Sequence, residues 1–283
     1  MSSEALQEVV ALLGCPAAGH PAQFLFGRLF EAAGLDWQFV TCDVPVDRLA
    51  EALGGLTALG FRGCILSGPL REAALPVVGS ASPSAVFAAA VGVCVLEPAD
   101  RSLGGLTGHM TDGRAVVEAI RSHVDPAGAR VLVVGSGAAA RATALELSLA
   151  RAGEILVCDR AAARVAAVVE AVTTLGSTPA TAVPWNDTIM VPEGVGIVIT
   201  ALPSDGPKPP AQLGGLRPDL VVADLALRGQ PSPVIAMARA AGACCVDGLE
   251  IHTARTAIDF QTLTGSEADP EVIRDALDEF FSV

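Results

Sequence analysis

Short apolar runs alternate with amphipathic stretches along the whole chain. Val131–Val134 is a continuous β-branched run suited to a buried parallel strand, and Val9–Leu13 and Trp37–Cys42 are predicted as short apolar strands. Gln23–Ala33 and Val46–Leu56 carry apolar residues at three- and four-residue spacing, as amphipathic helices do. This alternation predicts an α/β fold. The other predicted strands are Cys64–Leu66, Val91–Leu96, Ile197–Ala201, Leu220–Ala223 and Ala243–Val246, and the other predicted helices are Asp112–His123, Arg160–Leu175 and Asp269–Phe281.

Residues 129–160 combine a strand, a glycine turn, a helix and a second strand that ends in an acid. The turn GSGAAA fits the G-x-G-x-x-G/A pattern of a dinucleotide site, in which the first glycine permits a tight turn and the second lets the backbone approach a pyrophosphate. The helix that follows aims unpaired N–H groups and its positive dipole end at that phosphate. The cofactor contacts predicted in this turn are Gly135, Ser136, Gly137, Ala138 and Ala139.

Asp159, at the end of the second strand, stands near the spacing at which an acid meets the adenosine ribose. A glycine-rich turn between strand and helix also occurs in doubly wound sheets that bind no nucleotide. The ordered strand, turn, helix, strand and acid favour cofactor binding over that alternative.

Composition narrows the classes of function. The net charge is −13 and the basic residues form no cluster, which argues against a nucleic-acid partner. Seven cysteines include no metal-binding spacing, so we expect no metal, and free thiols in apolar runs fit a reducing, cytoplasmic location. The amino terminus lacks the basic segment of a signal peptide, and the longest apolar run, Ala85–Leu96, is too short to span a membrane.

Two residue counts restrict the chemistry further. The chain has no tyrosine, and Lys208 is its only lysine. A mechanism that needs either side chain as proton donor therefore has almost no candidates.

The order of motifs resembles the shikimate dehydrogenase family over nearly the whole length. VLVVGSGAAARA is similar to the family's V-L-x-x-G-A-G-G-A-A-R-A, ITALPS to its N-A-T-P turn, VVADL to V-Y-D-L, CVDGL to V-D-G-L, and TGHMTDG to G-x-N-T-D-G. The resemblance implies a substrate-binding α/β domain at 1–108, onto which helices at 250–283 pack back, and a Rossmann cofactor domain with a doubly wound parallel sheet at 109–249. At the family level, it also implies a homodimer. It adds Ala201, Leu225 and Gly248 to the predicted cofactor contacts.

The family's substrate-binding positions are altered in this chain. Two serines of the family's S-x-S element fall on His20 and Ala22, and its N-x-T-x-P-H-K segment falls on Ile65, Ser67, Pro69, Leu70 and Arg71. The family's two asparagines fall on Gly92 and Met110, and the glutamine of its C-terminal helix on Arg255. The resemblance thus gives His20, Ser67 and Arg255 as substrate-binding candidates, but for a ligand other than shikimate.

The family pairs a lysine with an aspartate at the carbon that exchanges hydride, and the matching residues here are Arg71 and Asp112. A guanidinium stays protonated, so Arg71 suits an anion clamp or an oxyanion stabiliser better than a general base. A surface arginine that caps a loop is the alternative. Asp112 opens a predicted helix, where it could serve catalysis or capping. If a proton moves, His20, His109 or His252 could replace the missing lysine.

The same residues bear on the choice of cofactor. Asp159 can accept hydrogen bonds from both ribose hydroxyls and repels a 2′-phosphate, which favours NAD over NADP. Arg160 and Arg164 fit the basic element of NADP-using family members, and Arg160 could stack on adenine with either cofactor.

The sequence therefore predicts an NAD(P)-dependent oxidoreductase that interconverts a secondary alcohol and a ketone on a small acidic substrate. Arg71 and Arg255 suggest more, or differently placed, negative charge than shikimate carries. Dehydrogenation of shikimate or quinate itself, and a non-catalytic nucleotide-binding member of the family, remain alternatives.

Overall fold

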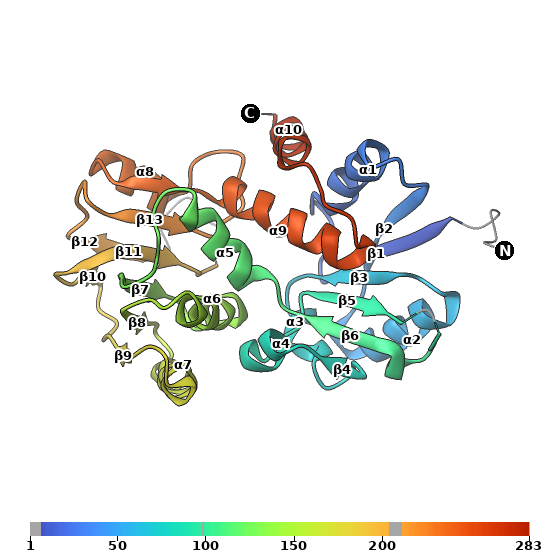
Figure 1. The fold of residues 1–283 in the computed structure, drawn as a ribbon, viewed down its shortest axis with the longest axis horizontal. Helices are drawn as coiled ribbons and strands as arrows, with labels where there is room; N and C mark the ends of the chain where they lie inside the picture. The colour runs from blue at the N-terminus through green and yellow to red at the C-terminus, as the bar shows by residue number, and fades with distance from the viewer. Residues whose placement is uncertain (1–6, 98, 204–210, 283) are drawn as a thin grey trace. The chain divides into compact units, whose positions relative to one another are not determined.

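The computed structural model describes residues 7–97, 99–203 and 211–282 and divides into two compact units. Unit 1 comprises Met1–Thr111 and Thr256–Ser282, and unit 2 comprises Asp112–Arg255. Each unit has its own six-stranded sheet (Figure 1).

The sheet of unit 1 contains both parallel and antiparallel strand pairs, and its strand order is β2-β1-β3-β5-β6-β4. Strand β1 pairs in parallel with β2 and β3, whereas β5 runs antiparallel to both β3 and β6. Its strands are β1 (Glu8–Gly14), β2 (Trp37–Asp43), β3 (Gly63–Leu66), β4 (Ser80–Ala81), β5 (Val93–Leu96) and β6 (Leu106–His109). Its helices are α1 (Ala22–Ala32), α2 (Leu49–Leu59), α3 (Leu70–Ala74), α4 (Pro83–Ala88) and α10 (Pro270–Phe281), with short 3-10 turns at Val46–Arg48 and Leu103–Gly105.

Aromatic side chains fill much of the core of unit 1. Phe26 on α1 lies within 4.7 Å of Phe39 on β2 and 6.0 Å of Phe260, measured between ring centroids. Helix α10 packs on α1, where Phe280 meets Phe24 at 5.9 Å. The C-terminal segment is part of the core of this unit, because Ile273, Ala276 and Leu277 of α10 are buried.

Unit 2 is an all-parallel sheet with the order β14-β13-β11-β7-β8-β9, the doubly wound arrangement predicted from the sequence. Its strands are β7 (Arg130–Val134), β8 (Glu154–Cys158), β9 (Ala180–Ala182), β11 (Val195–Thr200), β13 (Val221–Asp224) and β14 (Cys244–Val246); β10 (Thr188–Met190) and β12 (Gln212–Gly214) form a separate parallel pair. Its helices are α5 (Asp112–Arg121), α6 (Ala138–Leu149), α7 (Ala162–Leu175) and α8 (Pro233–Ala240). Helices α5, α6 and α7 pack side by side (Figure 1).

The chain passes between the two units twice. The first boundary, after Thr111, falls three residues later than the predicted start of the Rossmann domain, and the second, after Arg255, lies inside α9 (Gly248–Thr264). Thr111 belongs to unit 1 because its hydroxyl donates to the buried carboxylate of Asp259 at 2.6 Å. The first turn of α9 belongs to unit 2, where Asp247 accepts from the N–H groups of Leu249 and Glu250. Residues 250–255, expected with the substrate domain, therefore group with the cofactor domain.

Close packing of α5 on α6 gives a test of the fold. A Cβ added at Gly113 would lie 2.1 Å from the carbonyl oxygen of Ala142. We expect Gly113→Ala to lower the free energy of unfolding by about 1–3 kcal/mol, the usual cost of overpacking. Gly27→Ala is the matched control, because a Cβ there meets no atom of the described residues within 4 Å, and helix propensity should stabilise it by up to about 1 kcal/mol. Urea denaturation of both variants checks the sign, and a stabilised Gly113→Ala would contradict this packing.

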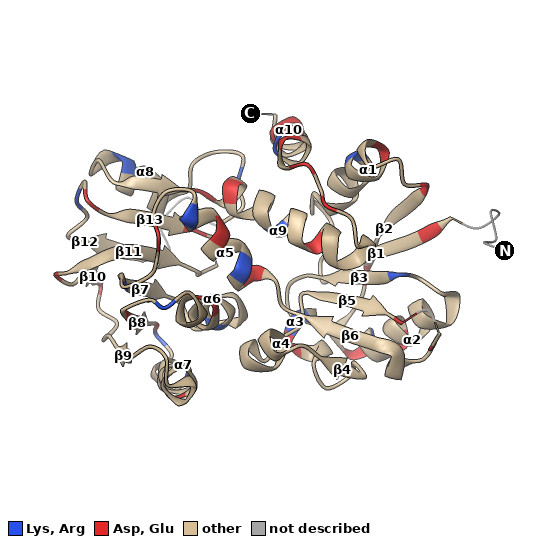
Figure 2. Cartoon of the chain, in the orientation of Figure 1, with Lys and Arg blue, Asp and Glu red and all other residues tan. Residues whose placement is uncertain are grey.

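Charged residues are scattered over both units (Figure 2). In the described ranges, the basic residues are arginines, which appear as isolated short stretches of ribbon, for example on α5 and α8 (Figure 2). Over the same ranges, no helix combines the length and the apolar character needed to cross a membrane.

Candidate functional site

The glycine turn adopts a conformation that only glycine accommodates easily. Gly135 has φ +129°, and a Cβ there would lie 2.6 Å from the carbonyl oxygen of Ala201. Its N–H donates to the carbonyl of Cys158 at 2.8 Å, which ties the turn to the end of β8. The first predicted glycine therefore shapes the turn by close backbone approach.

Gly137 has a different role from Gly135. It is the N-cap of α6 in an extended conformation, φ −73° and ψ −176°, and no side chain of the described residues caps the helix there. A Cβ at this position would meet no atom of the described residues within 4 Å. The open space and the amides at the start of the helix fit the pyrophosphate of a dinucleotide.

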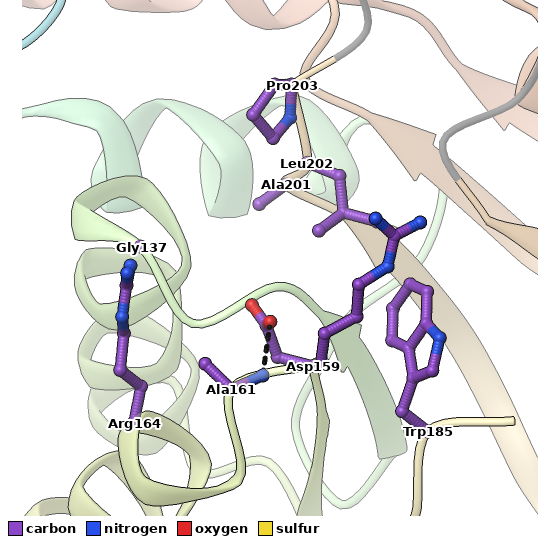
Figure 3. A pocket seen from close by; sticks show the side chains of 9 residues that line it. Gly137, Asp159, Ala161, Arg164, Trp185, Ala201, Leu202 and Pro203 are labelled. Carbon is purple, nitrogen blue, oxygen red and sulfur yellow. Dashed lines mark hydrogen bonds between the residues drawn. The ribbon is translucent and has the colours of Figure 1, made fainter.

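Asp159 is held in place by two hydrogen bonds. The hydroxyl of Ser136 donates to its Oδ2 at 2.8 Å. The N–H of Ala161 donates to its Oδ1 at 3.0 Å (Figure 3). Each carboxylate oxygen has a further lone pair, so the group can still accept from ribose hydroxyls. Ser136, predicted only as part of the turn, thus orients the acid.

Arg160 stacks on a side chain that the sequence did not single out. Its Cζ lies 4.8 Å from the ring centroid of Trp185, within range of a cation–π interaction. Arg160 was expected to stack on adenine, and the structure shows an indole as a stacking partner within the protein. The flat guanidinium therefore has a defined orientation beside the cavity.

Five of the predicted cofactor residues, namely Gly137, Asp159, Arg160, Arg164 and Ala201, line a single cavity of about 500 Å³ (Figure 3). The other residues that line it are Ala161, Trp185, Leu202 and Pro203. Ala138 and Ala139 form the first turn of α6 next to it. Lys208 lies outside the described residues.

Two further predicted cofactor residues have packing roles in the structure. The N–H of Leu225 donates to the carbonyl of Thr200 at 3.0 Å. A Cβ at Gly248 would lie 2.0 Å from the carbonyl oxygen of Ala226, so this glycine is required by close backbone approach at the start of α9. The structure explains both residues without a ligand.

Sequence reasoning missed a buried acid at the end of β13. Asp224 is 1% exposed, and its Oδ1 accepts from the hydroxyl of Thr200 at 2.5 Å. Its Oδ2 has no hydrogen-bond partner within the described ranges. Both residues end neighbouring parallel strands, the edge where such sheets bind ligands. The signal was the acid that ends the apolar run VVAD.

Asp112 and Arg255 form a largely buried ion pair in unit 2. Arg255 Nε lies 3.2 Å from Asp112 Oδ1, and the two side chains are 16% and 7% exposed. Arg255 was predicted to bind substrate, and the structure shows in addition that its charge is balanced by Asp112, the predicted catalytic acid. Asp112 is the first residue of α5.

Arg71 lies in unit 1 on the short helix α3. Its Nη2 donates to the sulfur of Met110 at 3.3 Å. A Cβ at Gly92 would lie 3.5 Å from the same Nη2, so the long guanidinium occupies the space beside the glycine. The three altered residues, Arg71, Gly92 and Met110, therefore lie together in one cluster. The long side chain of Arg71 has space because Gly92 has no side chain, and the sulfur of Met110 accepts its hydrogen bond.

Ser67 and His20 have different surroundings in unit 1. The N–H of Ser67 donates to the carbonyl of Leu13 at 3.0 Å, and its hydroxyl sits over Gly14. His20 accepts from the N–H of Ala22 through Nδ1 at 3.2 Å. It lines a hollow of about 630 Å³ beside α1, and Ser67 and Arg71 do not line that hollow.

His109 and His252 were the other candidates for proton transfer. Burial lowers the pKa of His109 below its ordinary value, which favours a neutral imidazole at pH 7. His109 ends β6, and its carbonyl accepts from the N–H of Gly92 at 2.7 Å, so this histidine borders the Arg71 cluster. His252 lies on α9. Across the described residues, no three His, Cys, Asp or Glu side chains gather as a metal site.

The fold and the site define a two-domain α/β protein whose doubly wound domain binds a dinucleotide. Residues 13–94 match the family model described as the shikimate dehydrogenase substrate binding domain. The NADP(+) shikimate dehydrogenase of Citrifermentans bemidjiense is 30% identical over 92% of this chain and 90% of its own. The chain belongs to the shikimate dehydrogenase family, and it is an NAD(P)-dependent dehydrogenase of that type.

Solved structures agree with this assignment. The ligand-free 5-ketofructose reductase of a Gluconobacter strain has a TM-score of 0.89 at 28% identity, over 98% of this chain and 100% of that one. Shikimate 5-dehydrogenase of Thermus thermophilus, in complex with shikimate, has a TM-score of 0.82 at 26% identity, with the same coverage.

Proposed function

We propose that this dehydrogenase transfers hydride between NAD(P) and a small carboxylated alcohol or ketone other than shikimate, in a reducing cytoplasm. The observation that carries the proposal is the cluster of Arg71, Gly92 and Met110. A guanidinium, a missing side chain and a thioether replace three groups that the family resemblance assigns to shikimate. These three side chains cannot make the hydrogen bonds to shikimate that the family residues make. A ligand that leaves buried polar groups without hydrogen-bond partners is rejected strongly.

In this proposal Arg71 and Asp112 divide the chemistry. Arg71 holds a carboxylate or polarises the carbonyl oxygen by charge-assisted hydrogen bonds, because it carries no removable proton. Asp112 orients the reacting hydroxyl or exchanges its proton, while Arg255 balances its charge. When bound, the nicotinamide supplies the hydride chemistry, and the glycine turn, Asp159 and Arg160 would hold the cofactor.

Shikimate itself is the second candidate, favoured by the 30% identity to enzymes named shikimate dehydrogenase. A neutral keto sugar is a further comparison, because the Gluconobacter relative is named 5-ketofructose reductase. Purified protein should be assayed with NAD and NADP against shikimate, quinate, other hydroxy acids and neutral keto sugars, with Arg71→Lys in parallel. Turnover of a carboxylated alcohol above that of shikimate supports the proposal. Shikimate as the best substrate of the wild type would overturn it.

We propose further that NAD is preferred over NADP. The fixed carboxylate of Asp159 supports this choice, since it would repel a 2′-phosphate at the end of β8. Arg160 and Arg164 line the same cavity and attract that phosphate, and the NADP(+) names of several relatives favour it.

Replacing Asp159 by Asn therefore gives a clear prediction for cofactor choice. Removing one negative charge should shift the ratio of Kd values at least about tenfold toward NADP, because close charge pairs are worth about 1.5–7 kcal/mol. Arg164→Ala is the control and should move the ratio toward NAD. Fluorescence titration of the reduced cofactors measures both. NADP binding at least tenfold tighter than NAD in the wild type would refute the NAD preference.

A further inference from the structure

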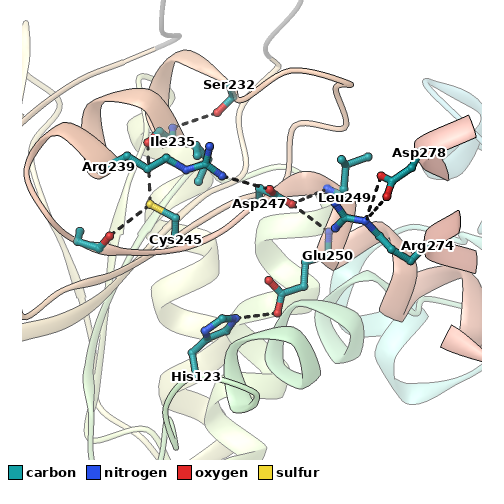
Figure 4. Close-up of polar contacts among 11 residues, drawn as sticks. His123, Ser232, Ile235, Arg239, Cys245, Asp247, Leu249, Glu250, Arg274 and Asp278 are labelled. Carbon is teal, nitrogen blue, oxygen red and sulfur yellow. Dashed lines mark hydrogen bonds and ion pairs between the residues drawn. The ribbon is translucent and has the colours of Figure 1, made fainter. Parts of the chain in front are cut away.

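We propose that Cys244, His123 and Glu250 form a reactive thiol site on the surface of unit 2, which exchanges with small disulfides. The three residues come from β14, from the segment after α5 and from α9. Cys244 Sγ lies 3.5 Å from His123 Nδ1, and His123 Nε2 lies 2.8 Å from Glu250 Oε1. Figure 4 shows the imidazole and the carboxylate facing each other. Cys244 is thus placed as the nucleophile, His123 as the base that it contacts, and Glu250 as the acid that orients the base.

The chemistry of the groups fixes the direction of each hydrogen bond. An ionised carboxylate only accepts, so Glu250 requires the hydrogen of His123 on Nε2. In the neutral imidazole, Nδ1 then carries the lone pair and accepts from the S–H of Cys244. His123 and Glu250 keep side-chain exposures of 30% and 32%, which lets a small reagent approach. Glu250 thus holds the tautomer that can take the thiol proton.

The adjacent cysteine shows how the site is selective. Cys245 is half-buried, and its sulfur lies 3.5 Å from the carbonyl oxygen of Ala243 (Figure 4). Burial raises the pKa of Cys245 above its ordinary value, which keeps it a thiol. Among all seven cysteines, Cys244 alone is exposed. The pair therefore provides a reactive and an unreactive thiol one residue apart.

Other charged groups lie close to the site. Asp247 precedes α9, and Arg239 on α8 lies 3.6 Å from it as an ion pair. Arg239 and Asp247 pair with each other, whereas Glu250 pairs directly with His123.

The exchange balances without any further oxidant. The proton of Cys244 moves to His123 Nδ1, and the thiolate attacks one sulfur of the reagent disulfide. A new S–S bond forms to Cys244 while the reagent's S–S bond breaks and its second sulfur leaves with the electron pair. The leaving thiolate takes the proton from His123. One protein thiol is oxidised to a mixed disulfide, and half of the reagent is reduced to a thiol.

The test is the rate of thiolate release from 5,5′-dithiobis(2-nitrobenzoic acid) by the folded full-length protein. We expect one fast equivalent at pH 7, which is lost in Cys244→Ser and kept in Cys245→Ser. His123→Asn leaves Cys244 exposed and should slow this phase at least about tenfold, with Glu250→Gln slowing it less. Between pH 8 and 6, the His123→Asn rate should fall by about tenfold per pH unit, as for an unassisted thiol, and the wild-type rate should fall less steeply.

Two outcomes would overturn the proposal. His123→Asn reacting at the wild-type rate and with the wild-type pH profile would mean that exposure alone makes Cys244 reactive. A fast phase that survives Cys244→Ser would place the reaction on another cysteine. Mass spectrometry after exposure to glutathione disulfide identifies the modified residue, and circular dichroism confirms that each variant is folded.

Discussion

Replacing Asp112 by Asn is expected to lower kcat by about 10²–10⁴-fold, the range that proton transfer by a placed side chain contributes. Asn keeps the size of the side chain but neither carries the negative charge nor exchanges a proton. The carboxylate starts α5 and is 7% exposed, so water cannot easily substitute for it. Steady-state assay with the best substrate from the screen measures kcat, and fluorescence titration should give an unchanged Kd for the cofactor.

The ion pair with Arg255 requires a control that separates chemistry from stability. Removing one partner of a buried pair leaves the other charge unbalanced and costs about 3–5 kcal/mol. The double variant Asp112→Asn with Arg255→Leu removes both charges, so we expect it to regain much of the unfolding free energy and none of the activity. If kcat of Asp112→Asn stays near the wild-type value in folded protein, Asp112 only pairs with Arg255 and starts the helix.

The long strands of both sheets could be predicted from the sequence because their apolar runs are continuous. After their first residues, β1, β7 and β8 are buried, and their polar positions are confined to Glu8, Arg130 and Glu154 at the strand starts, so the apolar pattern is clear. The short strands β9, β10 and β12 could not be predicted, since ATA, TIM and QLG contain no continuous apolar run, whereas the equally short β14 lies within the apolar run Ala243–Val246. Their places are set by contacts with neighbouring strands.

Two short helices carried a signal that was overlooked. Helix α4 begins after Ser82 with Pro83, and α8 begins after Ser232 with Pro233. In each, the serine hydroxyl accepts from a backbone N–H of the first turn, at 3.3 Å and 3.1 Å. Serine at the N-cap with proline at the next position is a known helix start. Helix α10 has a related start, with Asp269 at the N-cap and Pro270 at the next position.

The cofactor half of the site was predictable because a glycine turn fixes its own geometry within a few residues. The residues that needed tertiary contacts were not. Trp185 reaches Arg160 from a loop after β9, and Arg255 reaches Asp112 from another helix. Spacing along the chain contains no information on either contact. The pairing of Arg255 also changes the chemistry, because Arg71 remains the stronger candidate for holding a substrate carboxylate.

The two glycines of the turn should respond to substitution in opposite ways, and Gly137→Val is the sharper case. Any residue can adopt the extended backbone conformation of Gly137, and no described atom lies within 4 Å of the added Cβ. We therefore expect the free energy of unfolding to stay within about 1 kcal/mol of the wild type, the size of an N-cap effect. The branched side chain would fill the space that the pyrophosphate needs, so NAD(P) would lose one or more charge-assisted hydrogen bonds of about 1.5–3 kcal/mol each. That loss corresponds to a Kd at least about tenfold higher.

Gly135→Ala is the matched variant, and its effect should fall on the fold. Alanine at φ +129° is strained by about 1–3 kcal/mol, and its Cβ would lie 2.6 Å from the carbonyl oxygen of Ala201. We expect its melting temperature without cofactor to fall, whereas that of Gly137→Val stays near the wild-type value. Thermal melts with and without NAD(P) separate the two effects, because a bound ligand raises the melting temperature only when it still binds. A Gly137→Val protein with the full cofactor-induced shift would show that the pyrophosphate does not approach this backbone, and the cavity beside Asp159 would then bind the nucleotide in another way.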